Sequence, residues 1–427
     1  MPDRGFENFV FRKSLQCPRC LKIMPIRIDK IPSPAPRPDP PRAWLWFSLL
    51  IASLLLGIGW IVLFGGHTTT QQPIELWLPA IGIPFLGWCV LGFGRLLLHV
   101  GQHSVADGWD EARQKDMSRK YRQGRRYQQV LEASLYTTLR VPGEPATQQF
   151  DKLLGGVTPL RAQPARQGGE ISRHTRLSSG IDGDPRRTLL RILKSVLADL
   201  APALVKLPDN QPLALLLEVD TGLPEEQWRR VWRRAWRESG IRQSSTPLEV
   251  GGLTAVEHWL DHRIQDQALL LVVALQFAPK LPAGTAEVAA GLLFGNQLTQ
   301  TTLVPIARLH RPEQERKPTA DDLVYATRQS LDWVPVDTNS IEQVWRVGID
   351  SQRHGAIASA LAGVPMGKAG VCNLDESLGF PGCASPWLAI AAAAKTIQRG
   401  IGPQFIFSGS VADNGLWGTV LTPIVVN

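Results

Sequence analysis

Cysteine is scarce in this sequence, which holds five among 427 residues. An odd, sparse set in so long a chain does not form the disulfide framework of a secreted domain, so reduced thiols in a cytosolic setting are the simpler interpretation. The patterns G-x-x-x-x-G-K-[ST], H-E-x-x-H and G-x-S-x-G are also missing. Their absence argues against the commonest NTPase, metalloprotease and serine-hydrolase designs.

The bulk of the chain lacks any excess of positive charge. Residues 1–42 carry nine Lys/Arg against four Asp/Glu, and residues 101–126 carry seven against four, which gives +5 and +3. These sum to the formal net charge of +8, and residues 127–427 carry 29 groups of each sign. A nucleic-acid-binding protein concentrates basic charge on its folded domain, so we expect no nucleic-acid partner. Basic charge that flanks apolar segments indicates membrane lipids instead.

Charge is absent altogether from residues 43–65 and 76–94. As a helix, the first run would extend about 35 Å, enough to cross a hydrocarbon core of roughly 30 Å. We therefore predict two transmembrane helices, over 43–65 and 76–98, with Arg95 reaching the interface. The connector between them lacks Lys and Arg, whereas both flanks are basic. The positive-inside rule then predicts a multi-pass protein of the inner (plasma) membrane, with both termini and the main domain cytoplasmic.

The rest of the chain divides into a tail, a linker and a large domain. Residues 1–42 are predicted to form a basic, proline-rich cytoplasmic tail, and residues 101–185 a basic juxtamembrane helix and a linker. That helix either lies near anionic headgroups or is solvated, its charges only setting topology. Over residues 186–427, apolar runs of strand length alternate with amphipathic helices, which predicts a soluble α/β domain.

Two cysteines of the tail, Cys17 and Cys20, have the C-x-x-C spacing that lets two thiolates bind one zinc ion. A zinc ribbon needs a second pair, and none follows nearby. A thioredoxin-type site needs a strand-to-helix turn, which the flanking residues do not indicate. Two chains could supply four ligands between them. We predict no cofactor, and favour an unligated pair over a zinc site.

One predicted helix of the domain carries a tryptophan stripe. Its sequence, PEEQWRRVWRRAWRESG, places three tryptophans at i, i+4 and i+8 on one face and arginines over the rest. The tryptophans either pack on the sheet beneath a solvated arginine face, which we favour because the domain is neutral, or help to dock a partner. The candidate partner-binding residues are Trp228, Arg229, Trp232, Arg233, Trp236 and Arg237.

The C-terminal part resembles the thiolase/ketosynthase fold. Residues 377–407, SLGFPGCASPWLAIAAAAKTIQRGIGPQFIF, combine a glycine-containing loop, an alanine-rich helix and a strand, as ketosynthases do. This resemblance, extended over 186–427, implies a thiolase-like domain. Ketosynthases use a nucleophilic cysteine at a helix N-terminus together with two histidines or a His/Asn pair. Here Phe380 stands where one histidine is expected, and no cysteine lies between Cys89 and Cys372.

The remaining candidate nucleophile is Cys383, just ahead of the alanine-rich helix, whose dipole can lower a thiol pKa. It lacks an identifiable base, with His354 only a remote candidate, and the central nucleophile is missing. An inactive, repurposed fold is therefore the better inference. A membrane hairpin before a degenerate thiolase-like domain also resembles the type VI secretion lipase adaptor family. The segments PLALLLEVD, PEEQWRRVWRRAW and LGFPGCASPWLAIAAAA carry that resemblance. It implies a chaperone that helps to load a lipase effector onto a secretion spike.

These patterns predict a non-catalytic, membrane-anchored adaptor. Its expected partner is a protein, such as a lipase effector or a secretion-spike protein, and no catalytic residues transfer from the resemblance. The alternative is a membrane-bound, thiol-dependent acyl-transfer or hydrolytic enzyme that uses Cys383 or Cys372. A third interpretation is a membrane scaffold that dimerises by sharing zinc between Cys17 and Cys20 of two chains.

Overall fold

The computed structural model describes residues 26, 28, 31–64, 78–141, 144, 147–166, 168, 170–178, 183–364, 366–367, 369–409 and 415–424. The chain forms two compact units, one of residues 27–120 and one built mainly from residues 121–427. Cys17 and Cys20 lie outside the described residues. A zinc site there therefore stays a prediction.

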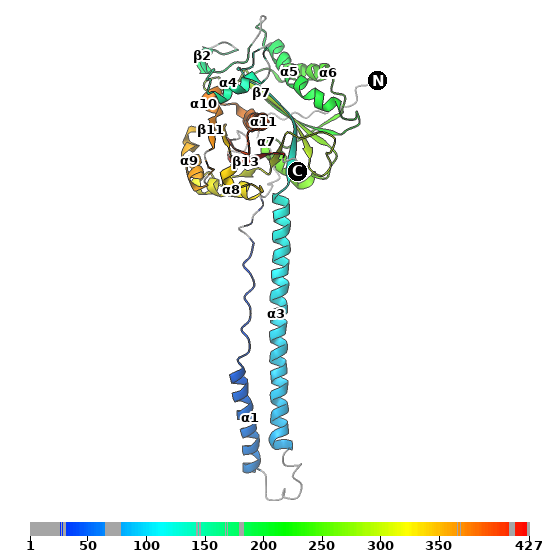
Figure 1. Ribbon diagram of the computed structural model, residues 1–427, viewed down its shortest axis with the longest axis vertical. Helices are drawn as coiled ribbons and strands as arrows, with labels where there is room; N and C mark the ends of the chain where they lie inside the picture. The colour runs from blue at the N-terminus through cyan, green and yellow to red at the C-terminus, as the bar shows by residue number, and fades with distance from the viewer. Residues whose placement is uncertain are drawn as a thin grey trace. The chain divides into compact units, whose positions relative to one another are not determined.

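The unit of residues 27–120 is built on α1 (Ala43–Phe64), η1 (Leu78–Gly82) and α3 (Ile83–Gly124). Helix α1 runs beside α3, and the indole Nε1 of Trp88 donates a hydrogen bond to the carbonyl of Trp46 at 2.9 Å (Figure 1). Two helical segments are long and apolar enough to cross a membrane, and their most apolar stretches are not buried within the chain. Both features fit the predicted membrane hairpin.

Helix α3 is longer than predicted, because the second membrane helix and the juxtamembrane helix are one continuous element of 42 residues. No proline occurs between Arg95 and Gly124, so nothing in the sequence ends the helix there. Along a straight helix, Arg113 lies about 22 Å beyond Leu98. That distance exceeds the screening length of about 8 Å at physiological salt, which favours the solvated interpretation of the basic segment.

The folded domain also begins earlier than predicted. Strand β1 (Tyr127–Tyr136) lies within the stretch 101–185 that the sequence assigned to helix and linker, yet it pairs with a strand on each side. Its sequence, YQQVLEASLY, mixes polar residues with good helix formers. Packing in the middle of a sheet overrides that weak local preference.

The domain holds an 11-stranded mixed sheet in the order β11-β10-β12-β13-β8-β1-β7-β6-β4-β5, with β9 paired to β13. Its two halves repeat one pattern. In the first, β4 lies parallel to β5 and β6 while β7 is antiparallel; in the second, β10 lies parallel to β11 and β12 while β13 is antiparallel. The strands are β4 (Leu213–Thr221), β5 (Ser245–Pro247), β6 (Leu269–Phe277), β7 (Val288–Asn296), β8 (Ala307–His310), β9 (Glu313–Gln314), β10 (Gln343–Val347), β11 (Gly370–Asn373), β12 (Gln404–Gly409) and β13 (Leu416–Pro423).

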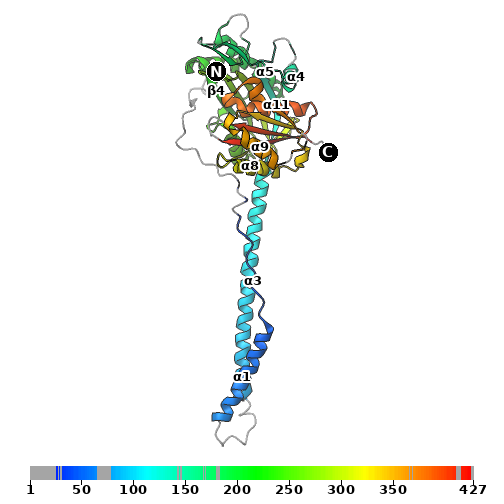
Figure 2. The same ribbon diagram turned by 90° about the vertical axis from the view of Figure 1, so that its left-hand side faces the viewer.

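Three buried clusters arrange the helices in layers around the two halves. One cluster joins α7 and α11 to the inner faces of both halves, a second packs α5 and α6 on the outside of the first half, and a third packs α8 and α9 on the second (Figures 1 and 2). Helices α7 and α11 therefore form a central layer. The helices of the domain are α4 (Gln148–Leu154), α5 (Pro185–Val205), α6 (Glu225–Glu238), α7 (Gly252–His262), α8 (Ala320–Asp332), α9 (His354–Gly363), α10 (Leu374–Leu378) and α11 (Ser385–Gln398).

Candidate functional site

The candidate site lies where the two central helices begin. The resemblance to ketosynthases implies a nucleophilic cysteine at a helix N-terminus. Of the two central helices, α7 begins at Gly252 with Gly251 as its N-cap, and neither residue is a cysteine. The backbone of Gly252 has φ +61°, a left-handed conformation that glycine adopts without steric cost. Cys383 lies instead ahead of α11, in the short helix η4 (Gly382–Ala384), which packs on the ends of β4 and β6.

A carboxylate from β4 fills the space at the start of α7. Glu218 Oε1 accepts a hydrogen bond from the backbone N–H of Gly252, and Glu218 Oε2 accepts one from Trp387 Nε1 of α11 at 2.9 Å. The N-terminus of a helix attracts negative charge because its free N–H groups point toward the ligand. The protein therefore supplies its own anion at the place where an oxyanion or thiolate could be stabilised.

The thiol of Cys383 is held in its neutral form. Burial, and the nearby carboxylates of Glu218 and Asp220, raise the pKa of this thiol well above its usual range. Its Sγ lies 3.7 Å from the carbonyl oxygen of Leu275 and donates to it. The predicted lowering of the pKa by the helix dipole is wrong, because desolvation and two negative charges outweigh it. Burial likewise raises the pKa of Cys372 to about 11.

No base reaches Cys383 among the contacts of the described residues. His354 is exposed at the start of α9, and its charge acts on Asp375 rather than on the thiol. Phe380, at the position expected for a histidine, takes part only through its backbone: its carbonyl accepts from Gln276 Nε2 at 2.9 Å. The activating groups that the resemblance would require are therefore replaced by structural contacts.

The loop that carries Cys383 is tightly packed. Gly382 has φ +57°, and a Cβ on this residue would lie 1.6 Å from Gln276 Oε1. The backbone N–H of Phe380 donates to the carbonyl of Gly284 at 2.8 Å, and that of Ala286 donates back to Phe380 at 2.9 Å. The loop is thus fixed between β6 and the segment that leads into β7.

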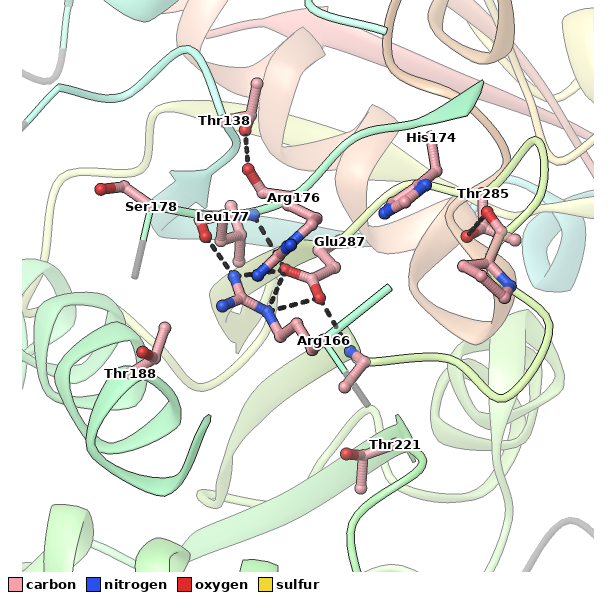
Figure 3. Close-up of polar contacts among 12 residues, drawn as sticks. Thr138, Arg166, His174, Arg176, Leu177, Ser178, Thr188, Thr221, Thr285 and Glu287 are labelled. Carbon is pink, nitrogen blue, oxygen red and sulfur yellow. Dashed lines mark hydrogen bonds and ion pairs between the residues drawn. The ribbon is translucent and has the colours of Figure 1, made fainter. Parts of the chain in front are cut away.

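A buried ion pair fastens an inserted hairpin over that segment (Figure 3). The hairpin consists of β2 (Arg161–Pro164) and β3 (Ile171–His174). After β2, Arg166 Nε meets Glu287 Oε1 at 2.7 Å, and each side chain is 2% exposed. Glu287 also accepts from the backbone N–H groups of Leu177 at 2.8 Å and Ala278 at 3.1 Å. We call this group the clasp, and it holds the hairpin, the loop and β7 together.

A second polar cluster lies at the opposite end of α7. Arg311 is buried and donates to both carboxylate oxygens of Asp261. Nearby, Trp333 Nε1 donates to Glu313 Oε1 at 2.6 Å. Burial raises the pKa of Glu313 to about 7, more than the opposing effects of Trp333 and Arg311 lower it. This end of the helix therefore makes stability depend on pH.

The predicted tryptophan stripe belongs largely to the core. Trp232 and Trp236 are buried in the cluster beneath α6, and Trp228 packs against it while partly exposed. Three arginines of the outer face, Arg229, Arg230 and Arg234, form ion pairs with glutamates of the same helix. Core packing of the stripe is therefore the correct alternative. Partner binding by Arg229, Arg233 and Arg237 stays a prediction.

Among the described residues, no group of three or more His, Cys, Asp or Glu side chains is arranged to hold a metal ion. The functional features that sequence reasoning missed are Glu218 and the clasp. Their only signal in the sequence is an acidic residue beside a buried strand. Glu218 lies near the end of β4, and Glu287 directly precedes β7. Neither position indicates its partner, which lies far away in the chain.

No family model matches the chain, and no curated protein matches its sequence. Among solved structures, the PfaC keto synthase-chain length factor aligns with a TM-score of 0.50 at 11% identity, over 70% of this chain and 43% of that chain. The ishigamide ketosynthase/chain length factor aligns with a TM-score of 0.50 at 13% identity, over 70% of this chain and 99% of that chain. Identities this low show the fold alone. The chain therefore carries a thiolase-like α/β domain, the fold class that its sequence predicted.

Proposed function

We propose that this protein is a non-catalytic adaptor, anchored in the inner membrane, whose cytoplasmic thiolase-like domain binds a protein partner. The observation that carries the proposal is the carboxylate of Glu218 at the start of α7, where it bonds Gly252 and Trp387. The raised pKa of Cys383 supports it, because a protonated thiol is a poor nucleophile. Glu218 already accepts from the backbone N–H of Gly252, so this donor is not available to a reaction intermediate.

The partner we propose is a lipase effector or spike protein of a type VI secretion system. The support for this identity is the resemblance of the membrane hairpin and the domain sequence to the lipase adaptor family. The experiment is purification of the tagged, natively expressed full chain in mild detergent, with mass spectrometry of the proteins that co-elute. A stoichiometric lipase or spike protein supports the proposal. A chain that elutes without any partner counts against it.

The docking surface we propose is the arginine face of α6. Arg229 is engaged by Glu225, so the sharper test reverses the charge of Arg233 and Arg237 together. The matched control reverses Lys317 and Arg328, two exposed basic residues of the second half. We expect R233E/R237E to lose most of the captured partner and K317E/R328E to retain it, with both variants folded. Equal capture by the two variants would exclude α6 as the docking surface.

The alternative function is a membrane-bound acyl-transfer or hydrolytic enzyme. It is favoured by one observation, the position of Cys383 beside the start of α11 in a fold whose aligned structures are named as synthases. Such an enzyme would have to deprotonate Cys383 beside two carboxylates. That requirement makes covalent acylation of Cys383 the property that separates the two functions.

A further inference from the structure

A seven-residue repeat runs along α3. A glycine recurs at every seventh position, and an aliphatic residue follows each glycine four positions later. The glycines are Gly87, Gly94, Gly101 and Gly108, and the aliphatic residues are Leu91, Leu98, Val105 and Ala112. A strict seven-residue period keeps all eight on one side of a helix that coils left-handedly around a neighbour. We call this side the glycine seam.

Among the residues that the structure describes, none packs on the glycine seam. A Cβ built on any of the four glycines would meet nothing within 4 Å beyond its chain neighbours and the nearby backbone of α3 itself. Leu98 is 64% exposed and Val105 is 74% exposed. The repeat continues past Arg95, where the uncharged run ends, so contact with lipid tails does not account for Val105 and Ala112. An aliphatic side chain facing water at this spacing indicates a packing surface.

The chain covers the opposite side of the same helix itself. Arg37 forms ion pairs with Asp107 at 3.2 Å and with Asp110 at 3.6 Å. The backbone N–H of Ala35 donates to Asp110 Oδ1 at 3.0 Å, and Arg113 Nε donates to the carbonyl of Pro32 at 2.7 Å. The proline-rich segment therefore runs along this side of α3. It leaves the seam free over the same turns.

Helix α1 does not fill the seam either. A cavity of about 200 Å³ opens between the two helices and includes the first seam pair. It is lined by Leu49, Ser53, Pro84, Gly87, Trp88 and Leu91. Glycine inside a helix is less favourable than alanine by about 1 kcal/mol, so four of them weaken an isolated α3 by about 4 kcal/mol. Close approach of another helix offsets such a cost, because small residues let backbones come near each other.

We propose that the glycine seam packs against the same seam of a second copy of this chain, as a parallel, left-handed pair of α3 helices. A second copy has the same topology, so its seam lies at the same depth, points the same way and matches glycine for glycine. From Gly87 to Gly108 the match extends over roughly 32 Å. Lys115 and Arg119 take the next two seam positions, and like charges there end the contact at Ala112. This pairing does not depend on the adaptor function.

Disulfide cross-linking in native membranes tests the pairing directly. The full chain is used with its five cysteines changed to serine and one new cysteine added. Val105→Cys places a thiol on the seam, and Gln114→Cys, nine residues or two and a half turns later, places one on the opposite side. A disulfide needs Cα atoms within about 7 Å. We expect mild oxidation to give a covalent dimer of V105C and none of Q114C.

A second set of cross-linking experiments adds bulky substitutions to the V105C chain. G94L/G101L improves the helix propensity of α3, so loss of the dimer would not reflect an unfolded helix. We expect it to reduce the cross-linked dimer about tenfold. The matched control, G59L, fills an open glycine on α1 and should leave the yield unchanged. Equal cross-linking of V105C and Q114C, a G94L/G101L yield equal to that of V105C, or V105C linked only to a different protein would overturn the proposal.

Discussion

Breaking the clasp should cost more free energy of unfolding than breaking any surface ion pair of the domain. The side chains of Arg166 and Glu287 are each 2% exposed, so removing one partner leaves a charge buried without its counterion. Such a change costs about 3–5 kcal/mol. Removing Glu287 also leaves the N–H groups of Leu177 and Ala278 without an acceptor, at roughly 1 kcal/mol each. We therefore expect R166M to lose about 3 kcal/mol and E287L about 5 kcal/mol or more.

A double-mutant cycle measures the interaction itself. R166M/E287L buries no charge, so it should be more stable than the sum of the single losses by at least about 2 kcal/mol. The matched control is the pair of Lys152 and Glu144, which lie 2.8 Å apart with side chains 35% and 37% exposed. Its coupling should stay below about 1 kcal/mol.

The assay is denaturant unfolding of the detergent-solubilised full chain, followed by tryptophan fluorescence. Several tryptophans of the domain are fully buried, which gives a strong signal on unfolding. Hydrogen exchange of β2 and β3 shows in parallel whether the hairpin opens before the rest of the domain. A coupling energy no larger than that of the surface pair would refute the view that the clasp holds the hairpin in place.

Three further changes should alter stability in defined ways. The folded-state pKa of Glu313, about 7, lies above its ordinary value of 4.5, so its stabilising effect, complete below pH 4.5, is lost as the pH rises through 7. The free energy of unfolding of E313Q minus that of the wild type should therefore increase by about 3 kcal/mol between pH 4.5 and pH 8. A difference that does not change with pH would contradict this. G382A should lower the free energy of unfolding by more than the roughly 1 kcal/mol expected of G156A. Both glycines have positive φ, but only a Cβ at position 382 would clash with another residue. Equal melting temperatures of the two variants would exclude the clash. Glu218→Ala should lower the free energy of unfolding by about 1–3 kcal/mol, because the N–H of Gly252 and the indole of Trp387 both lose their acceptor. An unchanged denaturation midpoint would show that Glu218 does not cap α7.

The strongly apolar elements were predictable from the sequence. The runs that form β4 and β6, and the alanine-rich α11, are buried on both sides, so a continuous apolar sequence is required of them. The stretch AEVAAGLLFG has a pattern that suits a small-residue helix as well as a strand, and it forms β7 because β6 and β1 pair with it on either side.

The polar central strands were not predictable. Residues 296–320 have the polar, proline-containing composition of an exposed connection. Nevertheless β8 and β9 lie there, and Arg311 is buried against Asp261. A charged side chain inside a protein depends on a partner brought by tertiary structure, which local sequence does not reveal. The same reason explains why Cys383 looked activated in sequence. The helix that follows Cys383 can be recognised in the sequence, but the carboxylates beside the thiol come from β4, far away in the chain.

The central claim is that the start of α7 is filled from within and that Cys383 does no covalent chemistry. Intact-mass measurement of the purified full chain after incubation with an excess of an acyl-CoA thioester tests it most directly, with C383A as the matched control. The account predicts that wild type and C383A keep the same mass. An acyl adduct present on the wild type and absent from C383A would contradict it and establish the thiol-dependent enzyme instead.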